Sequence, residues 1–165
     1  MGKHLDPGSK LLDLGTENPF TPQLKAAGYS VSNTQGENLD DDFKKIAQTT
    51  CNCVTAFEIF EHLLAPYNIL KELKCNKLIA SIPLKLWFAR AYWNESDDWD
   101  KHYHEFEPWQ FDMLLEKAGW KIIKKEFWKN PSYKIGIRTL LRNFTNRYYD
   151  VYAERSKTDY TTYYK

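Results

Sequence analysis

Glu58, Glu61 and His62 are the residues whose types and spacing point most directly to chemistry. On a helix, positions i, i+3 and i+4 lie on one face, so two carboxylates and an imidazole could converge on a divalent metal ion. Such an ion would lower the pKa of a substrate hydroxyl and help to present its oxygen as a nucleophile. The simpler interpretation, which we favour, places Glu58 at a ligand pocket, Glu61 in solvent and His62 at a strand-to-helix turn.

A second chemical signal is Asp13 followed by Gly15, at the end of the short apolar run Leu11-Leu12-Asp13-Leu14. An acidic residue near the carboxyl end of a strand, followed by a glycine turn into a helix, is typical of a nucleotide-binding crevice. The glycine lets the backbone approach a ligand closely. Many α/β domains contain this pattern, so it predicts a crevice and not a particular ligand.

His102 and His104 lie in an aromatic, charge-mixed segment over residues 84–107. Either imidazole titrates near neutral pH and could act as a general base. His104 is the weak catalytic candidate that we name; a structural hydrogen bond ahead of the helix that begins at Pro108 is the favoured interpretation. The aromatic residues of the segment could line a substrate pocket, or form a local core or a partner surface: Trp87, Phe88, Tyr92, Trp93, Trp99 and Tyr103.

The elements that must position these residues alternate between strands and helices. We expect strands over residues 10–14, 29–33, 53–57 and 77–82, and helices over 21–27, 66–74 and 108–118. Strand, glycine turn, helix and strand in quick succession indicate a βαβ unit, and therefore a parallel sheet with right-handed crossovers. Two late strands, over 120–127 and 148–154, have room for only a short helix over 138–144 between them. They predict an antiparallel hairpin at one edge of an α/β, Rossmann-like, mostly parallel sheet.

Composition limits the function classes. The 165 residues fit one domain, over residues 1–154, with a polar tail over 155–165. A net charge of +1 gives no general attraction to nucleic acids or anionic membranes, and no apolar stretch is long enough to span a bilayer. Cys51 and Cys53 could be a redox pair, but together with Cys75 we expect reduced thiols and a cytoplasmic protein.

Four segments in a fixed order carry a resemblance to a known family. Leu11–Gly15 is followed by Phe57-Glu58-Ile59-Phe60-Glu61-His62-Leu63, by Leu78–Pro83, and by His104-Glu105-Phe106 before a helix that ends in Ala118-Gly119-Trp120. From about residue 10 to residue 154 the sequence resembles the class I S-adenosylmethionine-dependent methyltransferases, in the branch with Glu-x-x-Glu-His after the fourth strand. Some relatives, including ubiquinone-type and small-RNA 2′-O-methyltransferases, use this segment for a metal.

The resemblance implies a set of cofactor-binding residues. They come from the loop after the first strand, the loop beside the adenine and the end of the fourth strand: Asp13, Gly15, Glu37, Asn38, Leu39, Phe57 and Glu58. The sequence departs from the family at Glu17 and Pro19, where further loop glycines are usual. It also has uncharged residues, 32–35, where an acidic residue normally binds the ribose; of these, Gln35 could still form a weaker hydrogen bond. Because only residues 34–52 separate the second and fourth strands, one crossover unit is expected to be shortened or absent.

The resemblance implies methyl transfer from S-adenosylmethionine to an oxygen or nitrogen of a small molecule, such as a sugar or a lipid-linked intermediate. No metal, nucleic acid or membrane partner is expected, and the oligomeric state is left open. The alternative is a catalytically inactive interaction module that keeps the fold and has lost cofactor binding. A nicotinamide-dependent oxidoreductase is a weaker rival, because the glycine-rich phosphate-binding turn of that class is missing.

Overall fold

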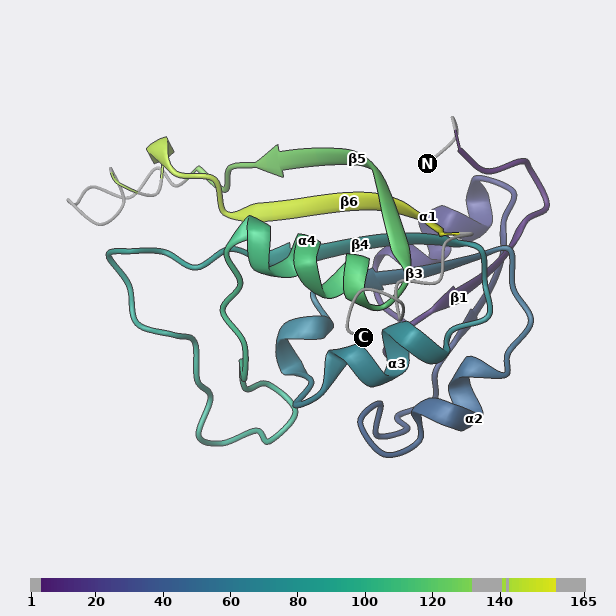
Figure 1. Cartoon of the computed structure of the whole chain (residues 1–165), viewed down its shortest axis with the longest axis horizontal. Coiled ribbons are helices and arrows are strands. Elements are labelled where there is room, and N and C mark those ends of the chain that lie inside the picture. Colours follow the sequence, from purple (N-terminus) through teal and green to yellow (C-terminus); the bar gives the residue numbers. More distant parts are fainter. Residues whose placement is uncertain (1–3, 132–140, 142, 157–165) are drawn as a thin grey trace, which may run out of the picture.

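The computed structural model describes residues 4–131, 141 and 143–156. Within them a six-stranded sheet has the order β2-β1-β3-β4-β6-β5 (Figure 1). The strands are β1 (Lys10–Asp13), β2 (Ser30–Asn33), β3 (Cys53–Phe57), β4 (Lys77–Pro83), β5 (Trp120–Trp128) and β6 (Tyr148–Arg155). The first four strands are parallel, whereas β6 is antiparallel to both β4 and β5. The predicted α/β, Rossmann-like sheet with an antiparallel edge hairpin is therefore confirmed.

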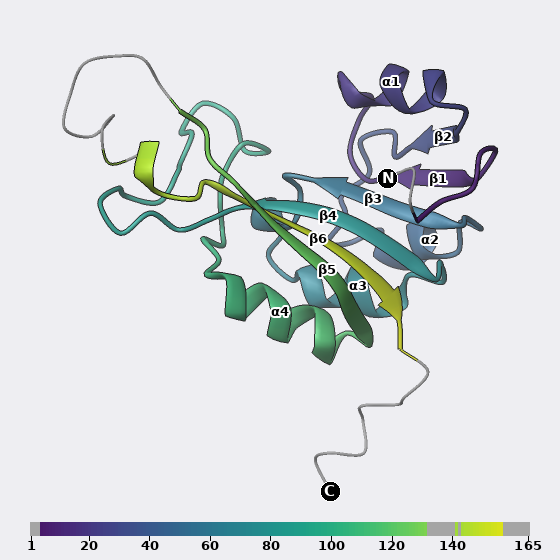
Figure 2. The same ribbon diagram turned by 90° about the horizontal axis from the view of Figure 1, so that it is seen from above.

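Helices cover the two faces of the sheet unequally. α2 (Phe43–Ala47), α3 (Pro66–Glu72) and α4 (Pro108–Lys117) lie on one face, and α1 (Phe20–Ala26) lies on the other (Figure 2). A short 3-10 helix, η1 (Phe60–His62), connects β3 to α3. None of the helices in the described ranges has the length and apolar character of a membrane span.

The connection between β2 and β3 is as short as the sequence predicts. Residues 34–52 form only the five-residue helix α2 and contain no strand. As a result β2 is an edge strand, and β1 lies directly between β2 and β3. The shortened crossover leaves the carboxyl ends of β1, β2 and β3 side by side, with the loops that follow them on one edge of the sheet (Figure 2).

The larger hydrophobic core lies between the sheet and the helices α2, α3 and α4. Trp120 is fully buried there, and its indole N–H donates to the carbonyl of Leu70 at 2.9 Å. The guanidinium of Arg155 lies 4.0 Å from the centroid of the Trp120 ring and donates to the carbonyl of Ala118 at 2.8 Å. Arg155, which we expected in the polar tail, therefore belongs to β6. Residues 157–165 of that tail, and most of the helix expected over 138–144, lie outside the described residues.

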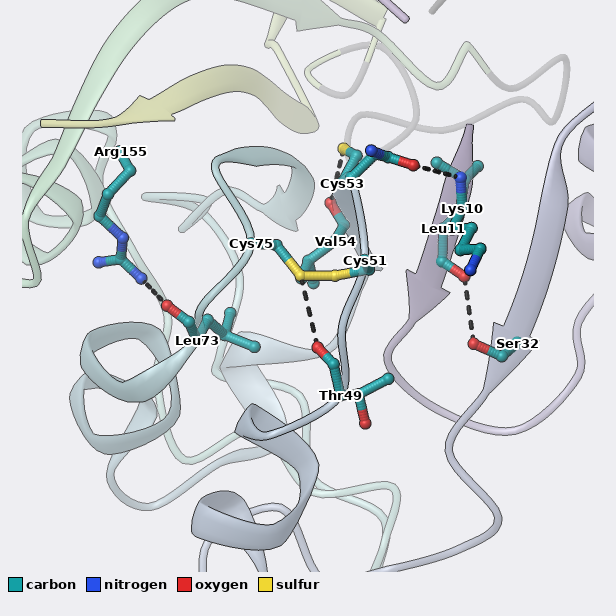
Figure 3. The surroundings of a disulfide bond; sticks show 11 residues. Lys10, Leu11, Ser32, Thr49, Cys51, Cys53, Val54, Leu73, Cys75 and Arg155 are labelled. Carbon is teal, nitrogen blue, oxygen red and sulfur yellow. Dashed lines mark hydrogen bonds between the residues drawn. A yellow bond between two sulfur atoms is a disulfide. The ribbon is translucent and has the colours of Figure 1, made fainter. Parts of the chain in front are cut away.

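A disulfide joins Cys51 to Cys75, with the two Cα atoms 5.4 Å apart (Figure 3). The prediction that all three cysteines are reduced thiols is wrong for this pair; Cys53 is free and buried. The strand register explains the pairing, because Cys53 lies opposite Lys77 in the parallel β3–β4 pair. Two residues upstream in each chain segment, Cys51 and Cys75 therefore also face each other. The spacing of the cysteines in the sequence does not reveal the strand register, so it could not predict the disulfide between Cys51 and Cys75.

Candidate functional site

A cavity of about 670 Å³ opens at the carboxyl ends of β1, β2 and β3. Its walls come from the loops after these three strands, from η1 and its exit, and from part of the segment between β4 and α4, residues 84–107, which we call the lid. The lining residues are Gly15, Thr16, Thr34, Gly36, Glu37, Asn38, Leu39, Asp40, Glu58, Ile59, His62, Leu63, Leu64, Asp97, Asp98, Trp99, Asp100 and Tyr103. Ligands of open α/β sheets bind at this kind of edge.

The loop after β1 requires its glycine. Gly15 has a φ of +99°, and a Cβ atom added there would lie 3.0 Å from the side chain of Ile59. The amide of Gly15 donates to the hydroxyl of Thr34 at 2.7 Å, which ties the loop after β1 to the loop after β2. Only glycine adopts this conformation without strain. Because Gly15 has no side chain, its backbone borders the cavity directly.

Asp13 lies behind that loop and is completely buried. Its carboxylate accepts hydrogen bonds from the hydroxyl of Thr55 at 2.5 Å and from the amides of Asn18 and Asn33, both at 2.9 Å. Burial raises the pKa of Asp13, and the three hydrogen bonds oppose that shift. The carboxylate thus links β1, β2, β3 and the following loop, and it does not line the cavity.

Five of the seven residues that the resemblance assigned to the cofactor line this one cavity: Gly15, Glu37, Asn38, Leu39 and Glu58. The other two do not. Asp13 holds the strand ends together as described, and Phe57 packs against Phe20 with the ring centroids 5.3 Å apart. Five residues of the predicted set therefore share one cavity, and Asp13 and Phe57 lie outside its lining.

The two departures from the family loop lie outside the cavity lining. The carboxylate of Glu17 is 3.3 Å from the ammonium of Lys25 and borders a separate, smaller cavity of about 330 Å³ beside β2. Pro19 precedes the first turn of α1. Gln35 uses its side chain to reach the carbonyl of Asn33 at 3.1 Å. The carboxylate of Glu17 is consequently not part of the lining of the cavity that Gly15 borders.

Glu58 lies at the end of β3 in a left-handed backbone conformation, with a φ of 56°. Such a conformation is uncommon for a residue with a side chain and is often found at functional sites. The hydroxyl of Ser81 donates to its carboxylate at 2.9 Å. Burial raises the pKa of Glu58 to about 7, so this cavity-lining carboxyl exchanges its proton near neutral pH.

Glu61 is also completely buried, and neither of its carboxylate oxygens has a hydrogen-bond partner among the described residues. Its Oε1 lies 3.7 Å from Nε2 of His62. Burial, followed by the charge of Glu58, raises the pKa of Glu61 to about 8. The expectation that Glu61 lies in solvent is wrong: the lid and the turn of η1 enclose it.

His102 completes a cluster with Glu61 and His62. Each of the three offers one ligand atom, and these atoms all lie within 4.8 Å of one another. The rings of His62 and His102 meet edge to face at 4.8 Å between centroids. Burial, and then His62, lowers the pKa of His102 to about 4, so its imidazole is neutral at neutral pH. The sequence spacing suggested Glu58, Glu61 and His62 as metal ligands. In the structure the third member of this group is His102 and not Glu58.

Hydrogen bonds hold the lid against η1. The backbone amides of Tyr103 and His104 donate to the carbonyl of Glu61 at 2.8 and 3.2 Å, and Nδ1 of His62 lies 3.1 Å from the carbonyl of Lys101. A second histidine of the lid, His104, has its Nε2 atom 3.3 Å from the carbonyl of Leu64. His104 does not line the cavity, and these contacts give it a structural role.

Only two of the six aromatic candidates, Trp99 and Tyr103, line the cavity. The lid residues that sequence reasoning missed are Asp97, Asp98 and Asp100. The lid has no helix or strand of its own in the described structure, so no periodicity marked which of its residues face inward. The compact run Asp-Asp-Trp-Asp was the one available signal.

No protein-family model matches the sequence, and no curated protein is similar to it in sequence. Solved structures are similar in fold. An S-adenosylmethionine-dependent methyltransferase from Methanosarcina mazei aligns with a TM-score of 0.63 and 12% identity, over 93% of this chain and 95% of that one. One from Archaeoglobus fulgidus gives 0.60 and 16% identity, over 90% and 86%. The chain has the class I S-adenosylmethionine-dependent methyltransferase fold.

A larger structure shares this methyltransferase fold. Phosphoethanolamine N-methyltransferase 2 from Haemonchus contortus, in complex with S-adenosylmethionine, aligns with a TM-score of 0.55 and 11% identity. The alignment covers 93% of this chain and 50% of that one. Within the methyltransferase fold, the strand ends that carry Gly15, Glu37 and Glu58 form the cavity described above.

Proposed function

We propose that the protein binds S-adenosylmethionine in the 670 Å³ cavity and transfers its methyl group to an oxygen or nitrogen of a small molecule. The observation that carries this proposal is the convergence of Gly15, residues 37–39 and Glu58 on one cavity. The family resemblance assigns these same residues to the cofactor. The volume lies within the usual range of roughly 300–1,000 Å³ for small-molecule sites.

Methyl transfer requires no covalent bond between the protein and the substrate. The methyl carbon leaves the sulfonium sulfur as it bonds to the acceptor oxygen or nitrogen, and the acceptor proton leaves to a base. Alignment of the two reactants provides most of the acceleration. Glu58 is the cavity residue suited to take up the proton, because its carboxyl has a pKa of about 7.

Calorimetric titration with S-adenosylmethionine and its demethylated product tests the proposal. We expect micromolar binding by the unaltered protein, and about tenfold weaker binding by Glu37→Ala, which removes a side chain from the cavity wall. Glu116→Ala, on the exposed face of α4, is the matched control and should bind normally. If neither compound binds at about 1 mM, the inactive interaction module becomes the better description.

A divalent metal at Glu61, His62 and His102 is a second candidate function. The observation that favours it is the buried carboxylate of Glu61, which has no hydrogen-bond partner among the described residues and lies next to two imidazoles. The three ligand atoms all lie within 4.8 Å of one another. One carboxylate and two imidazoles suit manganese, iron or zinc. Such an ion would lower the pKa of an acceptor hydroxyl. The competing arrangement is a protonated Glu61 and no metal.

Thermal unfolding in the presence of Mn²⁺, Zn²⁺ or Mg²⁺ separates these two arrangements. A bound ion raises the melting temperature of the unaltered protein, and we expect Glu61→Gln and His102→Ala to abolish that rise. Glu116→Gln, at an exposed position of α4 outside the cluster, provides the control carboxylate. An equal rise in all variants, or none in any, would leave the protonated carboxyl as the account of Glu61.

A further inference from the structure

The cavity is strongly acidic. Six of its lining residues carry carboxyl groups: Glu37, Asp40 and Glu58 on the strand-end wall, and Asp97, Asp98 and Asp100 on the lid. No lysine or arginine occurs among the lining residues found in the described part of the chain. A cavity whose walls have one sign of charge raises the local concentration of ligands of the opposite sign.

The lid carboxylates are held in place by contacts within the lid. Asp97 accepts a hydrogen bond from the amide of Trp99 at 2.9 Å. Asp100 accepts hydrogen bonds from the hydroxyl of Tyr92 at 2.7 Å and from the amide of Asn94 at 2.9 Å, which lower its pKa. Asp100 is therefore ionised at neutral pH, and hydrogen bonds within the lid hold both carboxylates in place.

One lid cation offsets part of this charge. The ammonium of Lys101 pairs with Asp98, lowers the pKa of that carboxyl, and lies 5.1 Å from the ring centroid of Trp93. Asp97 and Asp100 are left without a lysine or arginine partner among the described ion pairs. Trp99, between them in sequence, also lines the cavity and is 69% exposed, so its ring is available to a cation.

The proposed cofactor and its product differ in charge by one unit. S-adenosylmethionine has a sulfonium, an ammonium and a carboxylate, and so a net charge of +1. Transfer breaks the bond between the methyl carbon and sulfur, and the sulfur keeps the electron pair as a neutral thioether. The acceptor loses a proton, so the positive charge leaves with that proton and the product, S-adenosylhomocysteine, is neutral overall.

We propose that Asp97 and Asp100 make the cavity selective for the cationic cofactor over its neutral demethylated product. The inference rests on the proposed function and goes beyond it, because it assigns the discrimination to two lid carboxylates. By Coulomb's law, a carboxylate about 6 Å from a sulfonium would change its affinity about threefold in a solvent-exposed cavity. Methyl transfer thereby removes the charge that favours binding, and product release follows from the reaction itself.

Calorimetric titration with both compounds measures this selectivity as a ratio of dissociation constants. We expect the unaltered protein to bind S-adenosylmethionine about tenfold more tightly than S-adenosylhomocysteine at about 50 mM salt, and less selectively at about 500 mM. Asp97→Asn, Asp100→Asn and the double variant should lower the ratio stepwise toward about one. Sinefungin, whose protonated amine replaces the sulfonium methyl, should follow S-adenosylmethionine.

Binding of the neutral product serves as the internal control for folding, because it should stay the same in all variants. Glu95→Gln, an exposed lid carboxylate that does not line the cavity, should leave the ratio unchanged. Equal or tighter binding of the product by the unaltered protein would overturn the inference, as would equal weakening of both compounds in the aspartate variants. Failure of both compounds to bind would instead contradict the proposed function itself.

Discussion

Asp13 and Glu61 are both completely buried carboxyl groups near the same cavity, yet their surroundings are opposite. Asp13 accepts hydrogen bonds from three side chains, whereas neither oxygen of Glu61 accepts any from the part of the chain that the structure describes. Buried polar groups almost always have partners, so an unpartnered one requires an explanation. The comparison separates a carboxylate that the fold itself satisfies from one whose partner is a proton or a ligand.

The difference follows from the elements that carry the two groups. Asp13 ends β1, the strand between β2 and β3, so donors from both neighbours reach it in a fixed register. Glu61 lies on the single turn of η1 and is covered by a lid without regular structure. Among the described residues, the lid donates hydrogen bonds to the backbone carbonyl of Glu61 and none to its carboxylate. The neighbouring strand ends therefore supply the partners of Asp13, whereas the described part of the lid supplies none to the Glu61 carboxylate.

Asp13→Ala should cause the largest loss of stability. It leaves the hydroxyl of Thr55 and the amides of Asn18 and Asn33 without their shared acceptor, at a cost of about 4 kcal/mol. Urea unfolding followed by circular dichroism measures the loss. Asp13→Asn keeps one acceptor oxygen and should lose less. A cost below about 1 kcal/mol for the alanine variant would show that Asp13 does not link the strands.

Glu61→Gln should have the opposite effect to Asp13→Ala and should raise the free energy of unfolding at neutral pH. The pKa of Glu61 is about 8 in the folded protein and near 4.5 when unfolded, so the native state binds the additional proton between these values. Stability from this group is present in full below about pH 4.5 and is lost as the pH rises through about 8. In the presence of a chelator, we expect the unaltered protein to lose on the order of 3 kcal/mol between pH 5 and pH 8 relative to Glu61→Gln.

Urea titrations at both pH values give that difference between the two proteins. A parallel dependence on pH would mean that Glu61 has an ordinary pKa and hidden partners. Saturating Mn²⁺ should reduce the dependence in the unaltered protein if the ion occupies the cluster, because it compensates the buried charge.

Removing the disulfide tests whether the segments that carry Asp13 and Glu61 unfold as one cooperative unit. Cys51 and Cys75 are 24 residues apart, and the segment that they close contains Glu61 but not Asp13. Cys51→Ala should lower stability by about 2 kcal/mol or somewhat more. Amide exchange should increase around Glu61 more than around Asp13. A stability that is insensitive to reductant in the unaltered protein would show that the bond contributes nothing.

Much of the fold could be predicted from the sequence because the relevant signals are local. Apolar runs located the strands, and their alternation with a helix predicted the parallel part of the sheet. Two late strands without a full helix between them predicted its antiparallel edge. The short span between β2 and β3 predicted the missing crossover. These features depend on residues that are close in the chain. The register of β3 against β4, which pairs Cys51 with Cys75, depends on a long-range contact and could not be predicted in this way.

The site was predictable only in the part that comes from strand ends. Gly15, Glu37 and Glu58 follow strands that the sequence identifies, whereas Asp97 and Asp100 lie on a lid with no periodic pattern. The burial of Glu61 likewise depends on how the lid folds back over η1, a contact between segments about 40 residues apart. Long-range closure of irregular segments leaves no trace in local composition.

Glu17→Gly should have the smallest effect, and it sharpens the comparison by testing a carboxylate that is neither buried nor in the cavity. Its pairing with Lys25 is exposed, and such pairs contribute at most about 0.5 kcal/mol. We expect less than about a twofold change in the dissociation constant of S-adenosylmethionine, with Glu37→Ala as the contrasting cavity variant. A gain of tenfold or more would show that the charge of Glu17 reaches the ligand, and that loss of the family's loop glycine is what weakens cofactor binding.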